Sequence, residues 1–160
     1  LANRFASPCL LFDDHVDDET YPRDMKAWYE TGSDVSLIKT PTMLVELDRL
    51  VAQRPQLIFV EEPFGRERQC IGPLVDYAVL LDVPLEICLS RIIRRNLNAS
   101  PLFNADAIQS YLTKYESHLR NVYLTAVGQV RNNCDLVASG TNTLGQVVNL
   151  ITDQIRSNLI

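Results

Sequence analysis

The stretch Leu57 to Arg68, LIFVEEPFGRER, decides how the rest of the chain is interpreted. Its first four residues are apolar and run directly into two carboxylates, Glu61 and Glu62, before a proline and a glycine. A short apolar run with such boundaries predicts a strand that is buried on both faces of a sheet. Charge at the carboxyl end of a strand is typical of the ligand-binding edge of an open parallel sheet. An ordinary buried strand followed by a solvated turn explains these residues equally well.

The same pattern, an apolar run that ends on polar or acidic residues, occurs three more times. These runs predict strands at Cys9–Phe12, Tyr77–Leu81 and Asp135–Ala138. Apolar residues at helical spacing predict helices between and after them, the clearest at 85–96, 108–126 and 144–159. Thr40-Pro41 has the composition of a helix start, and Asp24 that of a helix cap. Strands that alternate with helices predict an α/β fold with a parallel sheet covered by helices on both faces.

Composition and charge exclude several classes of protein. The 160 residues fit a single domain, and the hydrophobic fraction of 46% is ordinary for a globular protein. The net charge of −5 argues against a nucleic-acid-binding surface, and no apolar run reaches the roughly 18 residues of a membrane span. The four cysteines are scattered, which argues against zinc and indicates reduced thiols in a cytoplasmic protein. The sequence leaves homo-oligomerisation open.

Four segments, taken in order, resemble motifs of the P-loop nucleoside and small-molecule kinases, in particular the uridine kinase and nicotinamide riboside kinase group. CLLFDDH at 9–15 resembles the second strand of that family, and FVEEPFG at 59–65 resembles the third. DVPLEICLSRIIRR at 82–95 is similar to the fourth strand with the Arg-rich helix that leads into the lid. DLVASGT at 135–141 resembles the last strand and the loop beside the adenine. The resemblance implies a three-layer P-loop kinase architecture, similar to the NMP kinases, in a single domain at 1–160, with a lid at about 91–106.

One family motif is missing. These kinases open with a strand, a G-x-x-x-x-G-K-[ST] loop and a helix, but none of the six glycines here precedes Lys-Ser or Lys-Thr. The first six residues resemble the helix after that loop, so we expect the sequence to be part of a longer kinase. In the family, the missing strand is central. We therefore expect 9–12 to pair with 57–60, and 77–81 with 135–138, with a gap of one strand between the two pairs.

The resemblance and the residue types together predict an ATP-dependent transfer of phosphate to a hydroxyl of a nucleoside or similar small molecule. Asp13 takes the position of the acceptor-binding carboxylate and is our candidate for the base. Glu61 is the candidate for Mg²⁺, which prefers one or two carboxylates with several waters. The predicted acceptor-binding residues are Asp14, His15, Trp28, Arg66 and Arg68. The predicted nucleotide-binding residues are Arg91, Arg94 and Arg95 of the lid, and Gly140, Thr141 and Asn142 beside the adenine.

Each of these assignments has a plainer alternative. Asp13 is also explained as a strand-end carboxylate that caps Thr20 or a backbone amide. The arginines of the 85–96 helix also fit a solvated cationic face, and His15 and Trp28 also fit a packing role. At the level of function, the alternatives are a kinase for another small metabolite and a non-catalytic binding module derived from a P-loop kinase.

Overall fold

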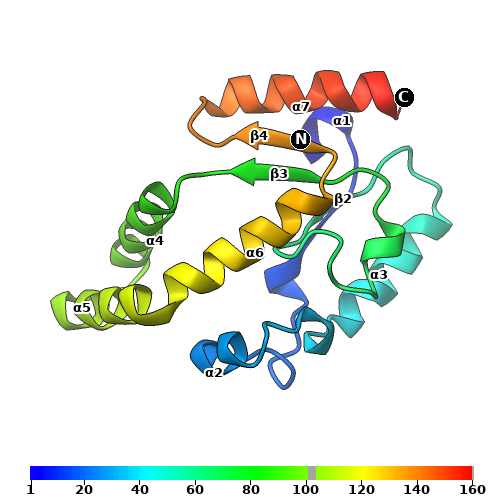
Figure 1. Cartoon of the computed structure of the whole chain (residues 1–160). Helices are drawn as coiled ribbons and strands as arrows, with labels where there is room; N and C mark the ends of the chain where they lie inside the picture. Colours follow the sequence, from blue (N-terminus) through cyan, green and yellow to red (C-terminus); the bar gives the residue numbers. More distant parts are fainter. Residues whose placement is uncertain (101–103, 160) are drawn as a thin grey trace.

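The computed structural model describes residues 1–100 and 104–159, and in this part of the chain four short strands form two separate parallel pairs (Figure 1). The strands are β1 (Cys9–Leu11), β2 (Phe59–Glu61), β3 (Val79–Asp82) and β4 (Leu136–Ser139). The α-helices are α1 (Ala2–Phe5), α2 (Met25–Glu30), α3 (Pro41–Ala52), α4 (Leu85–Ala99), α5 (Ala105–Lys114), α6 (Arg120–Asn133) and α7 (Leu144–Asn158). Among these helices, none combines the length and the apolar character needed to cross a membrane.

The strand pairing follows the sequence-based prediction. β1 pairs with β2 in parallel, with Cys9 opposite Phe59, and β3 pairs with β4 in parallel, with Val79 opposite Leu136. Within the described residues, β2 does not pair with β3. The prediction of two parallel pairs with no direct link between 57–60 and 77–81 is therefore confirmed. The fold is mixed α/β, as expected, although β1, β2 and β3 are each one residue shorter than the predicted runs.

The strands are less buried than their apolar sequences predict. Leu11, Leu81 and Val137 are 45%, 54% and 42% exposed, and residues 57–60 are only half buried. The prediction that 57–60 is buried on both faces is wrong for this structure. The physical reason is that β2 has a partner strand on one edge only, so its other edge and the adjoining side chains keep part of their exposure.

The helices begin where local chemistry favours them. The Asp24 side chain accepts hydrogen bonds from the first amides of α2, which confirms it as a cap. Thr143 caps α7 in a capping box with Gln146. Pro41 occupies the first turn of α3, as predicted, but the Thr40 side chain makes no capping bond there because its hydroxyl accepts from Arg68 instead.

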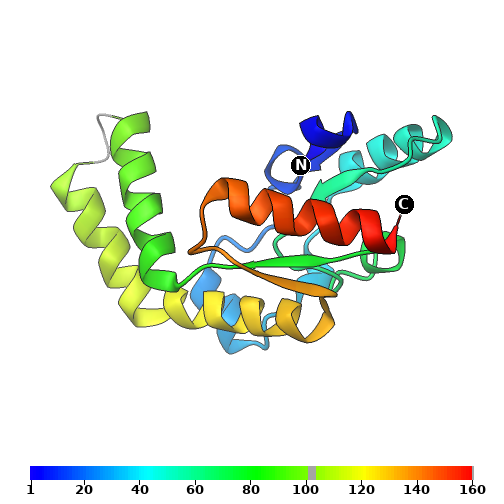
Figure 2. The ribbon, with the colours of Figure 1, turned by 90° about the horizontal axis from the view of Figure 1, so that it is seen from above.

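Two apolar clusters position the rest of the molecule. One lies beneath the carboxyl end of β1 and buries Phe12, Trp28, Val35, Ile38, Phe64 and Val122. Another lies under α7, where Phe59 of β2 and Val79 of β3 pack against Ala138 and Ile151. The second cluster therefore joins the two strand pairs through side chains. Around β3 and β4, helices α6 and α7 lie on opposite sides (Figure 2).

The long helix predicted at 108–126 contains an unforeseen interruption. α5 and α6 are joined without a break by η4 (Tyr115–Leu119), a π-helical turn whose two end residues are buried. η4 lies against α2. π-helical turns inside α-helices occur often at functional sites.

Candidate functional site

The carboxyl ends of β1 and β2 bring two acidic residues to the same place. Leu11 is in register with Glu61, and the chain then turns directly into a 3-10 helix, η1 (Phe12–Asp14). The Phe12 backbone N–H donates to Glu61 Oε2 at 3.1 Å, which holds that carboxylate beside the start of η1. Asp13, the predicted base, follows immediately and is exposed. The predicted base and the predicted metal ligand therefore lie at the ends of neighbouring strands.

The donor set at this position fits a magnesium ion that keeps much of its water. Glu61, Asp13 and Asp14 are all exposed at the strand ends. Across residues 1–100 and 104–159, no group of three or more His, Cys, Asp and Glu side chains is arranged as a metal cage. Mg²⁺ is usually bound by one or two carboxylates together with waters and substrate phosphates, so a full protein cage is not required.

Tyr21, which the sequence analysis did not single out, lies near Asp13. Burial raises the pKa of Tyr21, and nearby Tyr123 and Asp13 raise it further. Burial also raises the pKa of Tyr123, assisted by the Tyr111 hydroxyl 3.4 Å away and by Cys88 on α4. Tyr21 and Tyr123 therefore lie between Asp13 at the end of β1 and Cys88 on α4. The available signal was Tyr21 itself, an aromatic residue directly after an acidic run.

His15 and Trp28 differ in exposure. His15 is half-buried, and its Nδ1 lies 3.1 Å from Thr42 Oγ1 at the start of α3. Trp28 is buried in the cluster with Phe12, and its Nε1–H donates to the Asp34 carbonyl at 3.0 Å. Trp28 therefore has the packing role that was left open, as a support beneath η1. The predicted contacts of both residues with an acceptor stay predictions.

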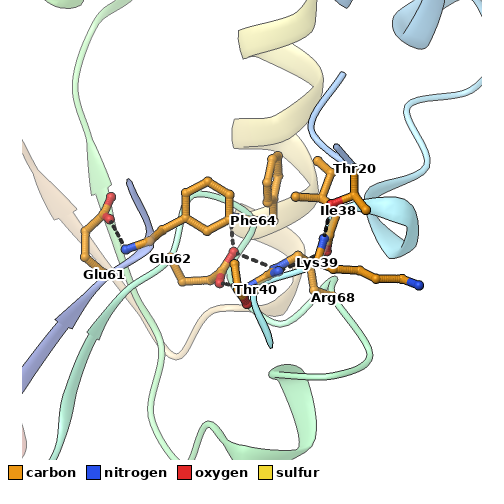
Figure 3. Close-up of polar contacts among 9 residues, drawn as sticks. Thr20, Ile38, Lys39, Thr40, Glu61, Glu62, Phe64 and Arg68 are labelled. Atoms are coloured by element: carbon orange, nitrogen blue, oxygen red, sulfur yellow. Dashed lines mark hydrogen bonds and ion pairs between the residues drawn. The ribbon is translucent and has the colours of Figure 1, made fainter. Parts of the chain in front are cut away.

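Arg68 has protein partners on all sides. Its side chain has no exposed surface and forms a 2.7 Å ion pair with Glu62, which is itself 6% exposed (Figure 3). Burial raises the pKa of Glu62, and the Arg68 guanidinium acts in the opposite direction. In this arrangement Arg68 supports the loop after β2, and its predicted contact with a substrate stays a prediction.

Arg66 lies at the amino ends of β3 and β4, whereas Asp13 and Glu61 lie at the carboxyl ends of β1 and β2. It donates to Asp135 Oδ2 at 2.6 Å and to the Asn133 carbonyl at 2.8 Å, just before β4. It also donates to the Val75 and Asp76 carbonyls, which precede β3. Arg66 therefore ties the loop after β2 to the start of the other strand pair, and its predicted substrate contact also stays a prediction.

The three lid arginines lie on α4, which leaves the carboxyl end of β3. Arg91, Arg94 and Arg95 are exposed, and none forms an ion pair with another described residue. Arg94 lines an open depression along α4 with Leu89 and Ile93. The predicted lid at about 91–106 includes residues 101–103, which lie outside the described residues.

The turn after β4 carries the residues expected near the adenine. The Gly140 N–H donates to the Asp82 carbonyl at 2.8 Å, and Ser139 Oγ lies 2.8 Å from Thr141 Oγ1. A Cβ at Gly140 would lie 2.1 Å from Val83 Cγ2, so only glycine fits this close approach. Thr141 and Asn142 are exposed. β1, β2 and β4 therefore carry predicted site residues at or just after their carboxyl ends, and β3 leads into the helix that carries the lid arginines.

No protein-family model, curated protein or solved structure matches this chain.

Proposed function

We propose that this chain belongs to an ATP-dependent phosphotransferase that phosphorylates a hydroxyl group of a nucleoside or similar small molecule. The observation that carries the proposal is the placement of Asp13 beside Glu61 at the carboxyl ends of two parallel strands. Open parallel sheets bind their ligands at this edge.

The strand order supports the same proposal. β2 and β3 each have one edge without a strand partner among the described residues, and side chains of both pack into the cluster under α7. One further parallel strand between them would give the order β1, β2, new strand, β3, β4. This is the order of the P-loop kinases that the sequence resembles, and the finer fold assignment is part of the proposal.

In this proposal, each residue has a stated role at the strand ends. Asp13 accepts the proton of the acceptor hydroxyl, since its carboxylate is exposed at the end of β1 and can reach an acceptor there. Glu61, with Asp14 nearby, would hold Mg²⁺, which neutralises charge on the transferred phosphate. Arg91, Arg94 and Arg95 would meet phosphate oxygens, for which the planar guanidinium is suited.

The test uses the complete gene product, with ATP, Mg²⁺ and a panel of nucleosides and other hydroxylated metabolites. We expect Asp13→Asn to reduce turnover by about 10² to 10⁴, the usual contribution of a positioned general base. ATP affinity should change little, because the base faces the acceptor. Glu61→Gln is the matched comparison, since excess Mg²⁺ should restore part of its loss.

Residues 1–160 alone provide a second comparison. They contain no glycine-rich phosphate loop, so we expect no saturable ATP binding by calorimetry at sub-millimolar concentration. If the Asp13→Asn enzyme kept more than about a third of wild-type turnover, well outside the general-base range, the base would have to be reassigned, first to Asp14. Saturable acceptor binding without any phosphate transfer would favour the non-catalytic binding module, which the absence of that loop from these residues also supports.

A further inference from the structure

Arg68 is the most completely enclosed charged side chain of the described residues, and every contact it makes is directional (Figure 3). Its Nε and Nη2 donate to the two carboxylate oxygens of Glu62, at 3.2 Å and 2.7 Å. Its Nη1 donates to the Ile38 carbonyl at 3.0 Å, and Nη2 donates to Thr40 Oγ1 at 3.0 Å. The guanidinium carbon lies 5.2 Å from the centre of the Phe12 ring.

These contacts reach both ends of the acidic segment at 12–20, which carries Asp13. Phe12 precedes Asp13 directly, and its N–H fixes Glu61. At the other end, the Lys39 carbonyl accepts from the Asp17 N–H, and the Lys39 N–H donates to Thr20 Oγ1, each at 3.0 Å. Lys39 lies between the two residues that Arg68 binds. One buried guanidinium therefore holds the start of the segment through the Phe12 ring and its later part through the backbone at 38–40.

Stability alone does not explain this arrangement. Replacing a buried ion pair by well-packed apolar side chains is often neutral or stabilising, so such a pair contributes little net free energy. What the planar fork provides is geometry, because its donors are fixed in direction and each of its three nitrogens has an acceptor. A lysine or an apolar residue at this position would not define the same three directions.

We propose that Arg68, oriented by Glu62, is a positioning residue that keeps Asp13 and Glu61 in their relative places. The inference rests on the proposed function, because it assigns the reacting group to Asp13. In this role Arg68 acts through Phe12 and through the backbone at 38–40.

The main variant is Glu62→Met with Arg68→Met in the complete gene product, which removes both charges together and leaves neither one unpaired. Arg68→Lys keeps the charge but loses the planar guanidinium, and it replaces the double variant in these measurements if the double variant does not fold. Arg66→Met is the matched control, because Arg66 makes as many contacts in the same loop but at the other ends of the strands. Turnover, KM values and amide hydrogen exchange are measured for each protein.

We expect the double variant to lose about 10²-fold in kcat, the scale of a small misplacement of a reacting group, with the KM for ATP unchanged. The Asp17 and Lys39 amides should exchange faster, while those of β3 and β4 keep their rates. Arg68→Lys should show smaller changes in the same direction. Arg66→Met should leave the exchange of both amides unchanged, because Arg66 bonds only at the amino ends of β3 and β4.

Wild-type kcat in a folded double variant would overturn the positioning role. Unchanged exchange at Asp17 and Lys39 would overturn it as well, whether or not the wild-type protein is a kinase. If the wild-type protein transfers no phosphate, the proposed function fails, and the exchange measurements still decide whether Arg68 holds the segment.

Discussion

Two arginines in one loop, Arg66 and Arg68, make similar numbers of hydrogen bonds in very different surroundings. Arg68 and its partner Glu62 are 0% and 6% exposed, whereas Arg66 and its partner Asp135 are 25% and 36% exposed. The buried pair lies next to the predicted catalytic residues, and the partly exposed pair lies at the opposite ends of the strands. Because the two arginines make the same number of hydrogen bonds, we expect burial to decide how strongly each ion pair holds the segments around it.

The largest effect should come from breaking only one side of the buried pair. Arg68→Ala leaves the Glu62 carboxylate enclosed without its cation, and we expect a loss of about 3–5 kcal/mol in the free energy of unfolding. Arg66→Ala should cost about 1 kcal/mol or less, because water replaces part of the lost contact. Urea unfolding of both variants measures the difference, and equal losses would contradict the comparison.

Features set by local sequence could be predicted, whereas contacts between residues distant in the chain could not. Apolar runs and caps located the four strands and α2, α3, α4 and α7, because periodicity and capping act locally. The pairing of the strands was predicted from the resemblance to a family. The sequence RER does not distinguish Arg66 from Arg68, since their burial depends on Ile38, Thr40 and Asn133 far along the chain. Tyr123 was missed for the same reason, because its proximity to Tyr21 exists only after folding.

An intermediate effect should follow from adding a methyl group against the backbone of Arg66. A Cβ at Gly72 would lie 2.4 Å from the Arg66 carbonyl oxygen, and this neighbour is backbone that cannot rotate away. We expect Gly72→Ala to cost about 1–3 kcal/mol, as overpacking usually does.

Gly128→Ala is the control for that variant, because nothing lies within 4 Å of a Cβ at Gly128 within α6. There we expect a gain of about 0.5–1 kcal/mol from better helix propensity. Thermal unfolding of Gly72→Ala and Gly128→Ala, compared with the wild type, measures both changes in stability. A Gly72→Ala protein as stable as the wild type would mean that the loop yields, and that Arg66 has more freedom than its bonds indicate.

The smallest effect concerns acid stability at the exposed pair. Burial alone would raise the pKa of Asp135, but hydrogen bonds from Arg66 and the Ala78 amide outweigh it and lower the pKa. A carboxyl with a lowered folded-state pKa stabilises the protein above its unfolded-state pKa of about 3.9, and this contribution disappears as pH falls through the folded-state value. Because the pair is partly exposed, we expect under about 1 kcal/mol.

Unfolding of the wild-type protein and of Asp135→Asn between about pH 2 and pH 6, which spans the ordinary carboxyl range, measures that contribution. The two proteins should differ near neutrality and converge at the acid end. A difference that grew on acidification would show that the pKa of Asp135 is raised, and that burial dominates at this pair after all.

The π-helical turn at η4 has a consequence for the angular phase of the helix around it. Tyr111 and Tyr123 are 12 residues apart, a spacing that puts two side chains about 120° apart on an uninterrupted α-helix at about 100° per residue. A π turn accommodates one extra residue, which reduces the effective spacing to 11 and the angle to roughly 20°. The two hydroxyls lie 3.4 Å apart, in agreement with this count. Deleting one residue within 115–119 would therefore turn Tyr111 away from Tyr123 and rotate every face of α5 relative to the acidic strand ends.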